Sequence, residues 1–346
     1  MRQFHTIVVG AGPGGLTCAE VLARNGRDVL VLEKNRLVGP KVCAGGITWA
    51  GLIRYVDESL IEKSFYDQHI VSGWQNVRIE ESTPIVATVN RERLGQWMLD
   101  RATAVGANVM RGTAVRRIFK NHVLTAGEEC FGFKYLVGAD GSSSTVRRYL
   151  GIGSERVGVG IHYQVPGDFE RMEWHLDTRS FRTGYAWIFP HKHSASIGVY
   201  ADHRAIRPKE LMVRFHEWIK RQGINLKGSQ QKAALINFDY RGWRFGNKFL
   251  VGDAAGLASG LTGEGIFPAI LSGEIAARAI IDENYNGKKL DHLIYKQRKH
   301  IRLLEFSAKN RRAGRLIIET LIMAMRLGLI HFSALEMGER FLNDEW

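Results

Sequence analysis

The first residues with recognisable chemistry form a glycine-rich turn near the start of the chain. Gly10, Gly12, Gly14 and Gly15 follow a β-branched run, and Glu33 ends the next apolar run. Glycines at this spacing allow a tight turn, bring backbone N–H groups close to a pyrophosphate and let a helix pack closely on a strand. A carboxylate at Glu33 suits the hydroxyls of a ribose that carries no 2′-phosphate. The sequence therefore predicts a dinucleotide site for FAD or NAD.

Two later segments favour FAD. Asp140, Gly141 and Arg147 follow one short apolar run, and Gly252 and Asp253 follow another. With the glycine turn, they match the three-part signature of FAD enzymes that resemble the hydroxybenzoate hydroxylase group. A cofactor as long as FAD must be held at its adenosine, pyrophosphate and ribityl parts, and Asp253 is expected to bind the ribityl hydroxyls.

Arg91 is similar to the arginine that reaches toward the FAD phosphates in this group, although Asn90 replaces the usual preceding aspartate. The chain has no second glycine fingerprint and no Cys-x-x-Cys pair, which excludes enzymes with two Rossmann domains such as the disulfide reductases. We therefore expect the electron donor to be NAD(P)H that visits transiently or a reduced redox protein.

The elements that position these residues alternate between strand and helix. Residues 6–32 read as strand, helix and strand, residues 91–104 read as a helix, and the aromatic-rich runs of 155–240 read as short strands. We predict an α/β fold with a Rossmann-like FAD-binding domain, an interleaved antiparallel-sheet substrate domain and a helical C-terminus. The predicted parts are an FAD-binding part at 1–155 with a substrate-domain insertion at about 48–90, a substrate sheet at 156–244, a last FAD-binding part at 245–285 and a basic helical region at 286–346.

Three aromatic residues alternate before Pro190: Tyr185, Trp187 and Phe189. On a strand they share one face and form an apolar wall with two polar tips. Such a wall suits a polyprenyl chain, which is held by shape and dispersion rather than by hydrogen bonds. A sheet face packed against an ordinary helix is the open alternative.

Cys43 lies in a turn with Gly45 and Gly46, and residues 262–266 read Thr-Gly-Glu-Gly-Ile. Together with the aromatic motif, these segments resemble the geranylgeranyl reductase family over nearly the whole chain through residue 280. Ala44 and Tyr200 stand where the family usually has glycine. The resemblance implies FAD-dependent saturation of isolated double bonds in an isoprenoid chain carried on a lipid, a diphosphate, a quinone or a chlorophyll precursor.

The resemblance also implies roles for individual residues. Cys43 and Tyr185 are the catalytic candidates, and the substrate would contact Trp187, Phe189, Gly45 and Gly46. The sequence does not identify the acid that protonates the alkene. If Cys43 only lines the site, the proton source would have to be sought among Tyr185, Glu264 and water. Beyond the residues already named for the cofactor, the resemblance adds Lys34, Cys43, Gly263, Gly265 and Ile266.

Composition restricts the class of protein further. The chain has 346 residues, of which 45% are hydrophobic and three are cysteines, so an ordinary globular protein with a large core is expected. No apolar run approaches the roughly 18 residues of a membrane span, and we expect a cytoplasmic protein.

His191 and His193 have no third metal ligand near them in the sequence. We therefore expect both histidines to be exposed, and we predict no metal site.

The net charge of +13 is concentrated near the C-terminus, where residues 288–326 hold eleven Lys and Arg against three acids. This favours a peripheral contact with an anionic lipid surface or a diphosphate headgroup, whereas a helix that simply caps the fold is equally compatible. Nucleic acid is disfavoured because aromatic residues do not interleave with the basic ones.

Two other functions remain open from the sequence. An FAD-dependent monooxygenase of a lipophilic substrate would share the three FAD motifs. A flavin-containing lipid carrier or electron-transfer protein would need the same cofactor without turnover. The sequence leaves the oligomeric state open.

Overall fold

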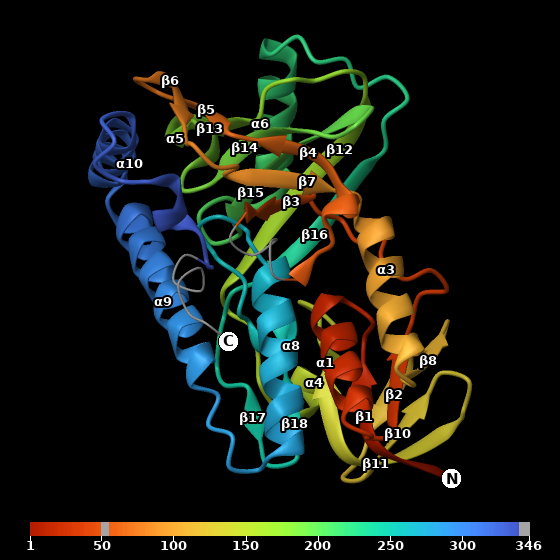
Figure 1. The fold of residues 1–346 in the computed structure, drawn as a ribbon. Coiled ribbons are helices and arrows are strands. Elements are labelled where there is room, and N and C mark those ends of the chain that lie inside the picture. Colours follow the sequence, from red (N-terminus) through yellow and green to blue (C-terminus); the bar gives the residue numbers. More distant parts are fainter. Residues whose placement is uncertain (50–54, 339–346) are drawn as a thin grey trace.

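The structure is a computed structural model that describes residues 1–49 and 55–338. Residues 50–54 of the predicted insertion and residues 339–346 of the predicted C-terminal region lie outside the described residues. Two large sheets and one small sheet dominate the fold, with long helices along their sides (Figure 1).

The first sheet has eight strands and carries the predicted nucleotide-binding motifs at the ends of its strands. Its central pairs, β18 with β11, β11 with β1, β1 with β2 and β2 with β8, are all parallel. Every residue of β2 is buried, as expected for a parallel strand that is covered on both faces. The strands are β1 (Arg2–Val9), β2 (Val29–Glu33), β8 (Asn108–Arg111), β9 (Val115–Ile118), β10 (His122–Thr125), β11 (Cys130–Gly138), β17 (Arg244–Phe245) and β18 (Lys248–Leu250).

Three helices pack together on one face of this sheet and share a core with its strands: α1 (Pro13–Arg24), α3 (Arg91–Ala104) and α8 (Ile266–Ile281). Gly14 of α1 and Gly273 of α8 allow the two backbones to touch, because a Cβ on Gly273 would collide with the Gly14 carbonyl. This close approach fixes the start of α1 against α8 and so fixes the glycine turn in space.

The second sheet has seven strands, and all of its pairs are antiparallel except β13 with β5. The long stretch of chain between β5 and β13 leaves room for the crossover that a parallel pair requires. The strands are β5 (Asp67–Ser72), β6 (Asn76–Glu80), β12 (Val157–Pro166), β13 (Glu173–Leu176), β14 (Tyr185–Pro190), β15 (Ser194–Asp202) and β16 (Gln231–Asn237). The small third sheet consists of β3 (Gly46–Thr48), β7 (Val86–Val89) and β4 (Ile61–Phe65).

The seven-stranded sheet has two different faces. One face packs against α6 (Pro208–Arg221), and Ile188 of β14 belongs to this core. The other face carries Tyr185, Trp187 and Phe189, as the alternation of the sequence predicts. These three side chains pack toward α10 and the segment that follows it, so the face is closed by the C-terminal helices.

The remaining helices connect or cover the sheets. In Figure 1, α9 runs along one side of the molecule and α10 lies beside β5 and β6. No helix among the described residues is both long enough and apolar enough to cross a bilayer. The remaining bounds are α4 (Thr145–Tyr149), α5 (Thr178–Phe181), α7 (Gly252–Ala255), α9 (Lys288–Lys309), α10 (Arg311–Arg326), η1 (Glu58–Leu60) and η2 (Phe332–Leu335).

The architecture confirms the predicted fold class. A Rossmann-like sheet is interleaved with a largely antiparallel sheet, and the described C-terminal region is helical.

Candidate active site

One continuous pocket, with a cavity volume of about 650 Å³, runs from the glycine turn to the aromatic wall. This volume lies within the usual range of ligand pockets. Among the predicted cofactor and substrate residues, all line the pocket except Gly15, Gly45 and Arg147.

The glycine turn leaves open space where a phosphate would lie. Gly12 is the N-cap of α1, and a Cβ built on it would have only the Ala139 carbonyl nearby, at 3.9 Å. By contrast, Gly10 has a φ of +103° and Gly15 has no room for a side chain beside the Gly10 carbonyl. Gly14 is also packed, so the turn combines three packed glycines with one, Gly12, that has open space at a helix N-terminus.

Glu33 is held firmly at the end of β2. Its Oε2 accepts a hydrogen bond from the Ala11 amide at 2.8 Å, and its Oε1 accepts one from the Asn35 amide at 2.9 Å. Each carboxylate oxygen keeps a further lone pair for a hydroxyl group. The predicted contact with a ribose is therefore compatible with this geometry, and Lys34 lines the same end of the pocket.

Arg91 is the strongest sign of an anionic ligand. It is the first residue of α3, where the Asn90 side chain caps the helix by accepting from the Glu92 and Arg93 amides. The Nε and Nη1 atoms of Arg91 are buried and have no hydrogen-bond partner, although the side chain lines the pocket. A buried guanidinium without a partner is costly, and a cofactor phosphate would satisfy it.

Asp140 and Arg147 have different surroundings from each other. Asp140 lines the pocket, its Oδ2 accepts from the Thr145 amide at 2.6 Å, and its buried Oδ1 has no partner. Arg147 is 2% exposed and donates to the carbonyls of Gly153, Ala254 and Asp239. The structure thus places Arg147 behind the pocket, where it braces α4 and α7, and its contact with FAD stays a prediction.

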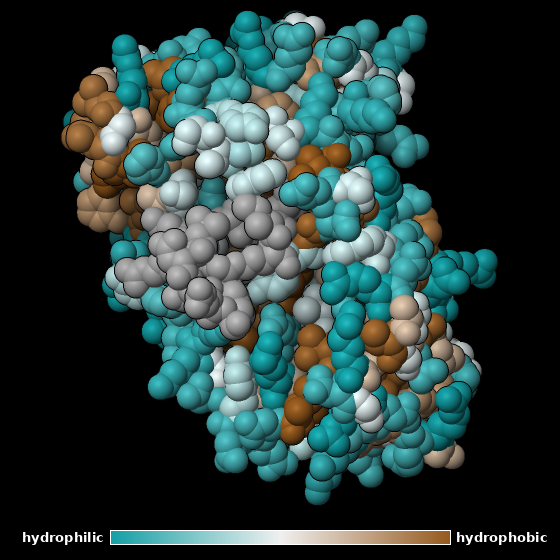
Figure 2. All heavy atoms as spheres, viewed as in Figure 1, coloured by the Kyte–Doolittle hydropathy of each residue, from teal (hydrophilic) through white to brown (hydrophobic). Residues whose placement is uncertain are grey.

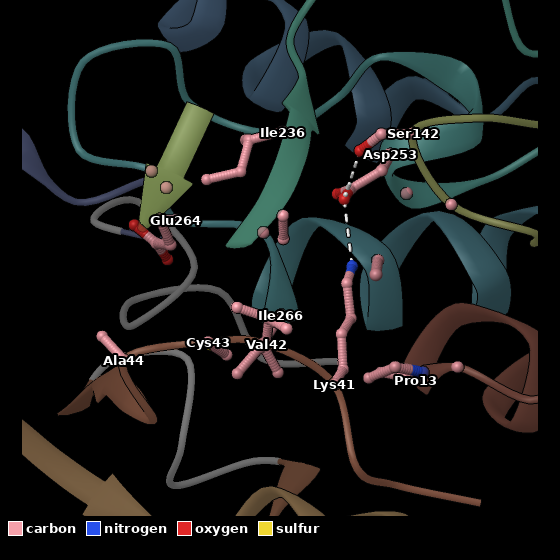
Figure 3. Close-up of a pocket in the computed structure, with 18 of the residues that line it drawn as sticks. Pro13, Lys41, Val42, Cys43, Ala44, Ser142, Ile236, Asp253, Glu264 and Ile266 are labelled. Carbon is pink, nitrogen blue, oxygen red and sulfur yellow. Dashed lines mark hydrogen bonds and ion pairs between the residues drawn. The ribbon is translucent and has the colours of Figure 1, made fainter. Parts of the chain in front are cut away.

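Asp253 is joined to a residue that the sequence did not single out as its partner. Its Oδ2 accepts from Lys41 Nζ at 3.0 Å and from Ser142 Oγ at 3.1 Å (Figure 3). The ion pair links the loop after β2 to the start of α7, 212 positions apart. It holds the carboxylate at the pocket, where the ribityl hydroxyls are expected.

These observations together fit FAD. An open glycine turn, a half-buried arginine with two buried unpartnered nitrogens, and two carboxylates lie along one continuous pocket. A backbone turn and a guanidinium are the groups that bind a pyrophosphate, and carboxylates bind ribose and ribityl hydroxyls.

The aromatic wall lies at the other end of the pocket. Tyr185 Oη donates to the Thr262 carbonyl at 2.5 Å, and Trp187 Nε1 donates to Ser196 Oγ at 3.1 Å. The two polar tips are therefore satisfied by the protein, so the wall offers its apolar faces to a ligand. Trp174, which the sequence analysis did not single out, packs against Tyr185 with a ring-centroid distance of 5.2 Å.

The opposite side of this end is aliphatic. It is lined by four side chains of α10 and one of η2: Ile318, Leu321, Ile322, Met325 and Phe332. The helix that could have been a simple cap is therefore a wall of the pocket, and only tertiary packing reveals this.

His191 corrects one expectation from the sequence. We expected it to be exposed, but it is buried: its Nδ1 lies 2.6 Å from Glu62 Oε2 and its Nε2 lies 3.0 Å from the Ala44 carbonyl oxygen. The strand β14 carries it inward behind Phe189, where it braces the Cys43 turn. His193 is exposed, and no cluster of metal ligands occurs among residues 1–49 and 55–338.

Cys43 lines the pocket, whereas Gly45 of the same turn lies behind the lining and does not. The Gly45 amide donates to Cys43 Sγ at 3.4 Å, and the thiol is free and partly buried. A Cβ on Gly45 would lie 2.6 Å from the His191 ring, so the glycine is needed where the turn approaches His191.

Glu264 is a functional candidate that the sequence analysis named only as a fallback proton source. It lines the pocket, accepts from Thr48 Oγ1 at 3.2 Å and from the Met337 amide at 2.9 Å, and burial raises its pKa to about 7. Its neighbours touch both ends of the pocket, because Gly263 adjoins Tyr185 Oη and Gly265 adjoins Asp253 Oδ1. The available signal was an acid between two glycines in a mostly apolar segment.

Figure 3 shows how these side chains are arranged. Lys41 and Asp253 lie at one side and Glu264 lies at the other, with Cys43 and Ile266 between them. An acid that is half protonated near neutral pH thus lies where the cofactor end meets the apolar end of the pocket.

Comparison with known proteins agrees with this geometry. The FAD binding domain family matches residues 3–294. The digeranylgeranylglycerophospholipid reductase of Methanocaldococcus jannaschii is 26% identical, over 80% of this chain and 78% of that protein. The chloroplastic geranylgeranyl diphosphate reductase of Oryza sativa is also 26% identical, over 84% of this chain and 69% of that protein.

Solved structures show the same fold. A geranylgeranyl bacteriochlorophyll reductase-like protein from Thermoplasma acidophilum superimposes with a TM-score of 0.82 at 22% identity, covering 97% of this chain and 95% of that chain. PqsL, a probable FAD-dependent monooxygenase from Pseudomonas aeruginosa, superimposes with a TM-score of 0.68 at 20% identity, covering 92% and 100%. The chain therefore belongs to the FAD binding domain family and is an FAD-dependent oxidoreductase that resembles the geranylgeranyl reductases.

Proposed function

We propose that this protein saturates isolated C=C bonds of an isoprenoid chain carried on a lipid, a diphosphate, a quinone or a chlorophyll precursor. One observation carries the proposal: the pocket that fits FAD continues into an apolar end walled by β14 on one side and α10 on the other. The polar tips of Tyr185 and Trp187 are already bonded to the protein, so this end suits a ligand that lacks polar groups. The names of the 26% identical relatives support the same class of substrate.

Bound in its reduced form, FAD would supply the hydride that adds to one carbon of the alkene. An unactivated alkene accepts hydride poorly, so a proton must reach the other carbon early or at the same time. Glu264 suits this role because burial raises its pKa to about 7, which keeps part of the carboxyl protonated at neutral pH. Each reduced bond would thus gain one hydride and one proton.

Cys43 and Tyr185 have other roles in this proposal. Burial raises the pKa of Tyr185, and its hydroxyl donates to the Thr262 carbonyl, so the phenol holds the loop that carries Glu264. Cys43 lines the pocket between the two ends and would position the alkene by contact. The electron donor is NAD(P)H or a reduced redox protein.

Anaerobic turnover tests the proposal. Reduced enzyme is mixed with geranylgeranyl diphosphate without oxygen, and mass spectrometry follows the gain of two hydrogens per saturated bond. The fully saturated diphosphate serves as the control that should leave the flavin reduced.

The likeness to PqsL favours one alternative, a monooxygenase. If no hydrogens are gained without oxygen, and if oxygen uptake matches the formation of an oxygenated product, the monooxygenase replaces the reductase.

A further inference from the structure

The helix α10 has two faces with different partners. The side chains of Ile318, Leu321, Ile322 and Met325 point into the pocket. The other face, which we call the outer face of α10, follows the helical spacing of Leu316, Thr320, Met323 and Leu327 and continues to Leu329. One helix therefore separates the apolar end of the pocket from the surface.

The outer face is apolar and exposed. Leu316, Leu327 and Leu329 are 57%, 64% and 74% exposed, and Met323 is 41% exposed. Figure 2 shows hydrophobic residues gathered over α10, at the upper left of the same view as Figure 1. Large apolar side chains clustered on one exposed helix face mark an interaction surface.

Positive charge surrounds this face, and its one acid is turned away. Arg311 and Arg312 are exposed at the start of α10, and Arg326 is exposed in its last turn. Glu319 is buried, where its Oε2 accepts from Ser72 Oγ at 2.7 Å and from Gln75 Nε2 at 3.0 Å. The β5–β6 hairpin thus holds the only carboxylate of α10 by hydrogen bonds, away from the outer face, and anchors the helix.

The same hairpin adds an aromatic side chain to the surface. Trp74, at its tip, is 61% exposed, and the Arg315 guanidinium carbon lies 4.5 Å from its ring centroid. Arginine and tryptophan beside exposed leucines are the composition of helices that lie in a membrane interface.

We infer that the outer face of α10, together with Trp74, docks on an anionic lipid bilayer and presents the apolar end of the pocket to it. This inference rests on the proposed function, because a prenyl chain carried on a lipid would pass from the bilayer into a pocket walled by the same helix. A second copy of the chain fits the surface poorly, since pairing two outer faces would bring like charges together without an exposed acid on α10 to offset them.

Vesicle sedimentation tests the inference with the full-length holoenzyme. We compare neutral phosphatidylcholine vesicles with vesicles that also contain phosphatidylglycerol. The enzyme should bind the anionic vesicles, and high salt should weaken this binding because salt screens charges at a surface.

Two sets of variants separate the apolar and charged contributions. The first set, the leucine variant, should weaken vesicle binding by at least about tenfold, and it combines Leu316→Ser, Leu327→Ser and Leu329→Ser. Arg311→Gln with Arg312→Gln should weaken it by about fivefold for each arginine removed. The control for the leucine variant combines Val213→Ser, Phe119→Ser and Tyr149→Ser on other elements. The control for the arginine variant combines Lys209→Gln and Lys220→Gln. Both controls should bind vesicles like the unaltered enzyme.

Three outcomes would overturn the inference. The first is equal binding of the enzyme to neutral and anionic vesicles, and the second is unchanged binding of the leucine variant. The third is that the unaltered enzyme does not bind vesicles but forms a dimer in analytical ultracentrifugation, and that the leucine variant does not form this dimer. The proposed function is tested separately, because all these variants should reduce soluble geranylgeranyl diphosphate at the unaltered rate. Only turnover of a prenyl lipid embedded in vesicles should fall in the leucine and arginine variants.

Discussion

The end of the pocket where we propose that FAD binds, the cofactor end, is assembled from short local motifs. The end that we propose for the substrate, the substrate end, is assembled from side chains far apart in the sequence. At the cofactor end, Gly12 and Glu33 lie at the ends of neighbouring parallel strands, and Arg91 begins a helix. At the substrate end, Tyr185 of β14 faces residues of α10, more than a hundred positions later. Backbone groups bind the charged cofactor, but an apolar chain is bound only by the shape of the assembled wall.

The loop that carries Glu264 connects the two ends. Gly263 adjoins Tyr185 and Gly265 adjoins Asp253, so Glu264 lies between one residue from each end. Substitutions at the cofactor end should therefore remove FAD, those in the loop should stop protonation, and those at the substrate end should have smaller effects.

The largest effect is expected for Gly12→Val. The new side chain would fill the open space at the start of α1 and displace a pyrophosphate from the backbone N–H groups. Hydrogen bonds to charged groups contribute about 1.5–3 kcal/mol each, so FAD affinity should fall at least tenfold. The ratio of flavin to protein absorbance measures the bound cofactor.

The control for this substitution is Gly127→Val, which places the same side chain in a turn with only Thr125 Oγ1 nearby, at 3.8 Å. This variant should keep its FAD. A folded Gly12→Val protein with full FAD content would contradict the assignment of the pyrophosphate site.

Glu264→Gln should leave FAD bound and reducible but slow alkene-dependent reoxidation of the flavin by roughly 10²–10⁴-fold, the usual contribution of a general acid. In the unaltered enzyme this rate should fall as pH rises through about 7, because the carboxyl then loses its proton. Anaerobic stopped-flow absorbance measures both half-reactions. The control is the exposed Glu217→Gln on α6.

The same substitution has an effect on stability that does not depend on turnover. The pKa of Glu264 is raised in the folded state, so the folded protein binds more protons than the unfolded chain between pH 4.5 and about 7. Protonated Glu264 therefore makes a contribution to the free energy of unfolding that is fully present below pH 4.5. This stabilisation is lost as pH rises through about 7. Denaturant titrations of the unaltered protein and Glu264→Gln should therefore converge at low pH and diverge by a few kcal/mol above pH 7. Parallel curves would contradict the raised pKa.

A moderate effect is expected for Tyr185→Phe. Loss of the hydrogen bond to the Thr262 carbonyl frees the loop before Glu264, at a cost of about 1–3 kcal/mol for an unsatisfied buried acceptor. Alkene-dependent reoxidation should fall about tenfold at constant FAD content. Tyr135→Phe removes the hydrogen bond from a tyrosine hydroxyl to Glu283, outside the pocket lining, and is the matched control. Equal losses in both variants would mean that the effect is not specific to the loop that carries Glu264.

The smallest effect is expected for Cys43→Ser. The replacement is nearly isosteric, so FAD binding and reduction by the donor should be unchanged. If Cys43 positions the alkene by contact, reoxidation should slow only a fewfold. A loss as large as that of Glu264→Gln would instead assign proton delivery to the thiol.

The sequence predicted the parts of the pocket that depend on local backbone geometry. A glycine turn between a strand and a helix, an acid at a strand end and a helix-start arginine have fixed positions relative to their own elements, so Gly12, Glu33 and Arg91 could be placed at the pocket. The alternation of Tyr185 and Phe189 on β14 likewise follows from the two-residue period of a strand.

Only the tertiary structure decided which residues surround these positions. Arg147 belongs to a cofactor motif but lies behind the pocket, because α4 turns its side chain toward three carbonyl groups. His191 is buried because Glu62 and the Cys43 turn pack around it. The pKa of Glu264 and the two faces of α10 depend on burial by segments distant in the chain, and desolvation has no signature in the sequence near the residue that it affects.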